Sequence, residues 1–155
     1  MFGGKNELNN LLKKVRGWII PVSLTLFSYI LLKFVLLIGY VPTPSMTPTL
    51  PERTLIVGCR WFGNLQTGDI IVFERDGVLM VKRIAGVPGE EIDLRELSYM
   101  TSVPIPVWEN PVIQIPEECY FVLGDNTDNS WDSRYWEDPF VRQADVRAKV
   151  WCPNG

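Results

Sequence analysis

The stretch GDIIVFERDGVLMVKRIAG, Gly68 to Gly86, decides the fold class of this chain. It contains two runs rich in apolar and β-branched residues, Asp69–Glu74 and Val78–Ile84, which we expect to be strands. The runs are joined at Arg75-Asp76-Gly77, and an Asp-Gly pair between two such runs is a strong hairpin signal. The sequence therefore predicts an antiparallel hairpin in the middle of the chain.

The segments on either side of this hairpin are also typical of short strands. TLIVGCRWF, starting at Thr54, and CYFVLG, starting at Cys119, are further apolar runs, and proline-rich segments such as SVPIPVWENP separate them. No convincing helical periodicity follows Pro42. We therefore expect a mainly β protein, with a small antiparallel β domain over residues 42–155.

The N-terminal part is a long apolar run. Gly17 to Val41 contains one charge in 25 residues, and a helix over Trp18–Val41 would extend about 36 Å, enough to cross a bilayer. A secretory signal peptide is the alternative, but it would have a shorter apolar region followed by a small-residue cleavage site. The first alanine in the chain is Ala85. The sequence predicts one uncleaved transmembrane helix over residues 18–41.

Charge placement predicts the orientation of this span. Residues 1–17 carry four basic side chains and one acidic one, whereas the first basic residue after the span is Arg53. Basic flanks stay in the cytoplasm, so residues 1–17 are expected there and residues 42–155 outside it, in a single-pass cell-membrane protein. Lys33, the one charge in the span, could snorkel toward the outer interface or mark an ion path.

Composition excludes several classes of function. Residues 42–155 hold ten Lys and Arg against seventeen Asp and Glu, which argues against a nucleic-acid partner. The chain has no histidine, which excludes a Ser-His-Asp triad and His-ligated metal sites. Cys59, Cys119 and Cys152 form no CxxC pair, and we expect neither a metal nor another cofactor. One disulfide among them is left open.

A serine between two prolines follows the apolar run. In VPTPSMTPTL, Val41 to Leu50, Pro44 and Pro48 fix their own φ and stiffen the backbone around Ser45. A slack linker would use glycine and serine instead. Ser45 lies four residues after the expected end of the span, a reach of about 14 Å, so we expect its hydroxyl near the outer membrane surface.

Without histidine, the plausible base for a serine is a lysine. Burial would have to lower the lysine pKa from about 10.4 toward about 7–8. The two-residue period of a strand puts Met80, Lys82 and Ile84 on one face, which gives Lys82 apolar neighbours. In the alternative reading the faces are swapped, with Arg83 inward and Lys82 in solvent.

Four segments together resemble a known family. PTPSMTPTL, GDIIVF, VKRIAGVPGE and GDNTDNSWDSRYW occur in the order and spacing of the boxes of type I signal peptidases. The resemblance implies a membrane-anchored serine endopeptidase of the signal-peptidase and repressor-protease fold type. Such an enzyme removes N-terminal signal peptides from exported preproteins through an acyl-enzyme. Signal-peptide-bearing preproteins, membrane lipid and the protein-export machinery are the implied partners.

The resemblance also implies roles for individual residues. Ser45 matches the nucleophile and Lys82 the general base of a Ser-Lys dyad. The backbone N–H of Ser45 and the hydroxyl of Thr43 match the oxyanion hole, and Ser130 matches the serine that orients the lysine.

The last box carries a further matched pair and two departures. Asp132 and Arg134 match an acidic and basic pair that supports the site. Thr127 and Glu137 stand where members of the family usually have arginine and glycine.

Other readings remain open beside this one. DNTDNSWDS resembles a calcium loop, but only one of four further EF-hand positions matches. Trp61 and Phe62 could dip into lipid or belong to the core. The alternative functions are a conjugative-pilin-type processing peptidase and a non-catalytic, membrane-tethered β module. A repressor-type Ser-Lys protein is less favoured, because this chain has a membrane span where those proteins have a DNA-binding domain.

Overall fold

The computed structural model describes residues 4–106 and 110–151, which include two compact units that divide after Val35. The first contains helix α1, Gly4–Ile30, and a π-helical turn, Leu31–Val35. Val15–Val35 is apolar and long enough to cross a membrane, since 21 helical residues extend about 31 Å. The expected N-terminal apolar helix is confirmed.

The predicted C-terminal end of this helix is wrong. Leu36–Val41 is not helical but forms strand β1, with Leu37 and Val41 buried in the β domain. A continuous apolar run has no periodicity that separates a helix from a buried strand, so the sequence did not show the change at Leu36. As a result, Ser45 lies ten residues after the helix rather than four.

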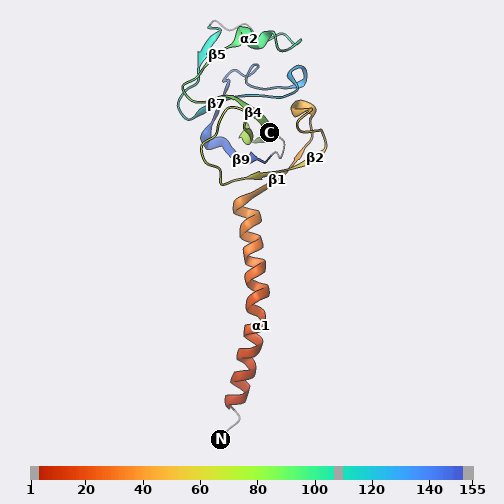
Figure 1. The fold of residues 1–155 in the computed structure, drawn as a ribbon, viewed down its shortest axis with the longest axis vertical. Coiled ribbons are helices and arrows are strands. Elements are labelled where there is room, and N and C mark those ends of the chain that lie inside the picture. The colour runs from red at the N-terminus through yellow and green to blue at the C-terminus, as the bar shows by residue number, and fades with distance from the viewer. Residues whose placement is uncertain (1–3, 107–109, 152–155) are drawn as a thin grey trace. The chain divides into compact units, whose positions relative to one another are not determined.

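The β domain is confirmed as a mainly antiparallel sheet. Seven strands pair in the order β1-β2-β9-β3-β4-β7-β8, and every pair is antiparallel (Figure 1). Beyond β1, the strands are β2 Thr54–Cys59, β3 Ile70–Arg75, β4 Val78–Gly86, β7 Cys119–Leu123, β8 Phe140–Arg142 and β9 Val146–Val150.

The central hairpin β3–β4 forms as predicted. Its two-residue turn places Asp76 and Gly77 at positive φ, 51° and 76°, as the tight turns of hairpins require. β3 is buried on both faces, with alternate side chains entering two different apolar clusters. This strand therefore lies between the two halves of the core, and β4 beside it carries Lys82.

A smaller element lies at the other end of the domain from β1 (Figure 1). It consists of β5, Glu91–Asp93, paired with β6, Val112–Gln114, and of the short helix α2, Leu94–Ser98. The sequence did not indicate this helix. Of the cysteines, Cys59 and Cys119 are free thiols, and Cys152 lies outside the described residues.

Candidate active site

The predicted nucleophile lies in a single 3₁₀ turn, Pro44–Met46. The turn is closed by a hydrogen bond from the Thr47 N–H to the Pro44 carbonyl, 3.0 Å. Met46 is fully buried in the cluster beneath β1 and β2, which anchors the turn, whereas Ser45 keeps 8 % of its surface exposed. Pro44 thus opens a fixed turn that holds Ser45, and Pro48 follows two residues after this turn.

The Thr43 hydroxyl lies beside the Ser45 hydroxyl, with 3.3 Å between Oγ1 and Oγ. Thr43 has extended backbone, φ −123°, and directly precedes the turn. If Ser45 Oγ attacked a carbonyl carbon, a negative charge would develop on the carbonyl oxygen. A hydroxyl held at this position could donate a hydrogen bond to that oxygen.

Lys82 is buried, at 3 % exposure, on the face of β4 that also carries Ile84. It lies directly across from Ile71 of β3, which is fully buried, and Met80 packs against the same cluster. The alternative reading, with Lys82 in solvent, is wrong. The strand period alone could not show which face of β4 the rest of the domain buries.

This burial changes the basicity of Lys82. Loss of hydration lowers the Lys82 pKa from 10.5 to about 8, while the nearby charge of Asp132 raises it and that of Arg134 lowers it again. Nζ donates a hydrogen bond to Ser130 Oγ, 3.0 Å away. A substantial fraction of Lys82 is therefore neutral near pH 8, as a general base requires.

The nucleophile turn and the lysine meet at Gly124. A Cβ on this residue would collide with the Ser130 side chain and would lie 2.5 Å from the Ser45 carbonyl oxygen, so only glycine fits. Among the described residues no hydrogen bond joins Ser45 Oγ to Lys82 Nζ. Catalytic hydrogen bonds are often long in a free enzyme and shorten when substrate binds.

Asp132 and Arg134 form a buried ion pair behind the site. Arg134 Nε and one of its terminal nitrogens donate to the two Asp132 oxygens, each at 2.8 Å, and both side chains are almost fully buried. The same carboxylate accepts a hydrogen bond from the Gly124 N–H at 2.9 Å. Breaking such a pair by removing one partner typically costs about 3–5 kcal/mol. The pair therefore supports the loop that Gly124 begins.

The aspartates of the possible calcium loop are bonded to protein groups. Asp125 pairs with Arg83 and Asp132 with Arg134, while Asp128 accepts hydrogen bonds from Thr101 and Ser102. Within the part of the chain that the structure describes, no group of three or more Cys, Asp and Glu side chains is placed to hold a metal ion.

Two contacts at the site were missed from the sequence. Arg83 binds Asp125 through two hydrogen bonds of 2.8 and 2.7 Å, which ties the residue after Lys82 to the residue after Gly124. Asn126 reaches the nucleophile turn, where it bonds Pro44 and Ser45. These partners lie more than 40 residues apart in the sequence, and no local pattern reveals such pairings.

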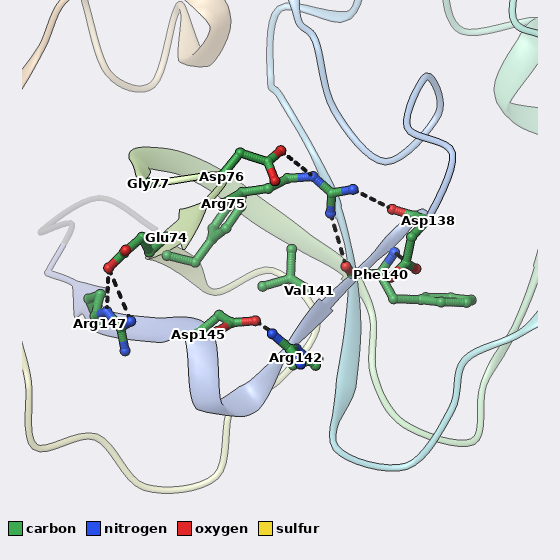
Figure 2. A pocket seen from close by; sticks show the side chains of 11 residues that line it. Glu74, Arg75, Asp76, Gly77, Asp138, Phe140, Val141, Arg142, Asp145 and Arg147 are labelled. Carbon is green, nitrogen blue, oxygen red and sulfur yellow. Dashed lines mark hydrogen bonds and ion pairs between the residues drawn. The ribbon is translucent and has the colours of Figure 1, made fainter.

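A separate polar pocket of about 440 Å³ lies at the β3–β4 turn and shares no residue with this cluster (Figure 2). Figure 2 shows its three arginines engaged by protein groups: Arg75 donates to the carbonyls of Asp138 and Phe140, Arg142 binds Asp145, and Arg147 binds Glu74. All three arginines of the pocket are therefore engaged by protein groups, and the pocket holds none of the side chains that the sequence assigned to the site.

Sequence comparison agrees with the geometry. Residues 14–100 and 96–153 match the family described as signal peptidase, peptidase S26. Similar proteins include probable signal peptidase I-2 of Synechocystis sp., 31 % identical over 63 % of this chain and 54 % of that protein. Signal peptidase I U of Bacillus subtilis is 34 % identical over 58 % of this chain and 60 % of its own length.

Coverage differs among the relatives. Signal peptidase I S of Bacillus subtilis matches over 84 % of both chains, at 26 % identity. The chain spans only 54 to 61 % of the length of the cyanobacterial relatives it matches. The two matched ranges together cover residues 14–153, which include most of the helix, the β domain and the cluster around Ser45. The chain therefore belongs to the signal peptidase family, peptidase S26.

Proposed function

We propose that this chain is a membrane-bound serine endopeptidase that removes N-terminal signal peptides from exported preproteins through a Ser45–Lys82 dyad. The observation that carries the proposal is the burial of Lys82 near the Ser45 turn, which lowers the Lys82 pKa to about 8. The chain that shows it belongs to the peptidase S26 family. A purely structural lysine has no need of such burial, which costs about 3 kcal/mol at neutral pH.

The proposed reaction has two steps, both using Lys82 as the base. Neutral Lys82 accepts the Ser45 proton while Oγ attacks the scissile carbonyl, and the oxyanion is held by the Thr43 hydroxyl and the Ser45 N–H. The C–N bond breaks and the Lys82 ammonium protonates the departing amine, which is the new N-terminus of the mature protein. Lys82 then deprotonates a water, which attacks the ester carbonyl. The ester C–O bond breaks, the Lys82 ammonium returns the proton to Ser45 Oγ, and the signal peptide leaves as a carboxylate.

We further propose that α1 anchors the chain with its N-terminus in the cytoplasm and its β domain on the other side of the membrane. The support is the group of basic residues at the start of the apolar helix and the absence of Lys and Arg from residues 36–52, which follow it. Preproteins that carry a membrane-spanning signal would then present their cleavage site on the side of the β domain.

The test of the activity is a processing assay with the detergent-solubilised chain and a radiolabelled exported precursor. We expect a product whose new N-terminus, read by mass spectrometry, lies immediately after the signal peptide. A non-catalytic β module would leave the precursor intact. A pilin-type peptidase would cleave a pilin precursor and leave general exported precursors uncut.

The pH dependence of the reaction follows from the Lys82 pKa of about 8. The base must be neutral, so kcat/KM is expected to rise about tenfold per pH unit below this value and to level off above it. The measurement is a pH–rate profile of the free enzyme from pH 6 to 10.5. A rate that still rises tenfold between pH 9 and 10 would mean that the base has the pKa of an ordinary lysine.

The partner proposed for the outer face of β1 and β2 is membrane lipid. Ile38 pairs with Val57 and Tyr40 with Leu55, and all four side chains are exposed on one side of the sheet. β1 starts directly after the apolar helix. Apolar and aromatic side chains next to a membrane span suit the lipid interface.

The two aromatic residues after β2 differ in burial. Trp61 is 85 % exposed, whereas Phe62 packs against the second core cluster. With the chain in vesicles of lipid brominated near the headgroup, we expect Trp61→Phe to remove part of the quenchable tryptophan fluorescence. Trp131→Phe, also at an exposed position, is the matched control and should remove little. Equal losses in both variants would contradict a lipid contact at Trp61.

A further inference from the structure

We propose that Asn126 is a positioning residue that holds the nucleophile turn, an inference that rests on the proposed function. Its side-chain Nδ2 donates a hydrogen bond to the Pro44 carbonyl, 3.2 Å. Its backbone N–H donates to the Ser45 carbonyl, 3.0 Å. One residue thus binds two successive carbonyls of the turn from a segment 82 positions away in the sequence.

The nucleophile turn needs such external contacts. It is one 3₁₀ turn of three residues, and Pro44 contributes no N–H to it. Short 3₁₀ pieces have poorer hydrogen-bond geometry than α-helices and are not stable by themselves. Burial of Met46 fixes one side of the turn. The contacts from Asn126 fix the carbonyls on the other.

Asn126 also leads directly to the partner of the base. Its carbonyl accepts a hydrogen bond from the Asn129 N–H, 3.0 Å, which closes the turn Thr127–Asn129. Ser130, which bonds Lys82, is the next residue. Asn126 therefore connects the segment that carries the nucleophile to the segment that orients the base, and a shift at this point changes the distance between them.

The chemistry of the contact favours an amide at this position. An aspartate has almost the same shape but cannot donate to the Pro44 carbonyl, and it would place a negative charge against two carbonyl oxygens. The loop itself has another anchor, because Asp125 is held by the two hydrogen bonds from Arg83. Removing the Asn126 side chain therefore loosens the nucleophile turn without releasing the loop.

The test uses full-length Asn126→Ala and Asn126→Asp, with Asn129→Ala as the matched control. Asn129 lies in the same loop, and its side chain is exposed. We expect kcat to fall about 10- to 100-fold in Asn126→Ala, because small displacements of a nucleophile have effects of this size. The fall should be at least as large in Asn126→Asp. In Asn126→Ala, KM, the thermal midpoint and the pH-profile midpoint near 8 should stay as in the unmodified chain.

Hydrogen exchange gives a readout that does not depend on activity. Amides of residues 41–50, followed by mass spectrometry, should exchange faster in Asn126→Ala than in Asn129→Ala. The proposal would be overturned if Asn126→Ala left both kcat and the exchange rates of residues 41–50 unchanged. It would also be overturned if kcat fell only together with the thermal midpoint, since the loss would then reflect general unfolding. If the unmodified chain cleaves no precursor while the exchange difference persists, the proposed function fails and the contact itself stands.

Discussion

Replacing Ser45 by alanine is expected to lower precursor processing by about 10⁴-fold or more, because the acyl-enzyme can then not form. Ser45 contributes its hydroxyl to one contact with Thr43 and little to the core, so the thermal midpoint should change little. The measurement is the single-turnover rate of precursor cleavage, together with the mass of the denatured enzyme during turnover.

The control for this experiment is Ser98→Ala at the end of α2, where the hydroxyl is exposed and bonds only a backbone carbonyl. This variant should process precursor at the normal rate and show the mass of an attached signal peptide when deacylation is slow. Ser45→Ala should show no such adduct. Processing by Ser45→Ala at the rate of the control would show that the nucleophile lies elsewhere.

Replacing Lys82 by methionine is expected to reduce the rate by at least about 10³-fold, because the Ser45 hydroxyl then loses the proposed base. Methionine fills a similar volume beside Ile71 and Ile84 without a charge. Lys149→Met on β9, at a partly exposed lysine, is the matched control and should keep normal activity. Normal activity in Lys82→Met would exclude the dyad.

Lys82→Met should also change how the free energy of unfolding depends on pH. The folded-state pKa of Lys82 is about 8 and its unfolded value is 10.5, so between these values the unfolded chain binds more protons. Stability from this group therefore rises as pH increases from 8 to 10.5 and is lowest below pH 8. Lys82→Met should remove this rise, and at pH 7 it should be at least as stable as the unmodified chain. The measurement is the free energy of urea unfolding of both chains at pH 7 and at pH 10.5.

Local patterns were sufficient for the hairpin but not for the buried face of its second strand. An Asp-Gly turn depends on neighbouring residues, and it was read correctly from the sequence. The two-residue period grouped Lys82 with Met80 and Ile84 but left open which face of the strand is buried, and the structure buries the face with Lys82. The helix end was not predictable in this way, because LLIGYV is as apolar as the span before it. Only pairing with β2 and the burial of Leu37 and Val41 make it a strand.

The candidate site was predictable to a different extent. The residue types and the order of the boxes indicated which side chains would gather, and the structure places Lys82 with Ser130 and Thr43 with Ser45. What the sequence lacked were the contacts between distant segments. The bonds from Asn126 to the nucleophile turn depend on how the loop after β7 packs against residues far earlier in the chain.

The position of β9 in the sheet matters while the chain is being synthesised. Val146–Val150 lies between β2 and β3, although these two strands are made long before it. A growing polypeptide that has reached only residue 145 has both of these strands as open edges, and its sheet is interrupted at the middle. Such a chain also lacks Val146, which belongs to the same apolar cluster as Ile71, the cross-strand neighbour of Lys82. The sheet and the surroundings of Lys82 are therefore complete only in a chain that includes β9.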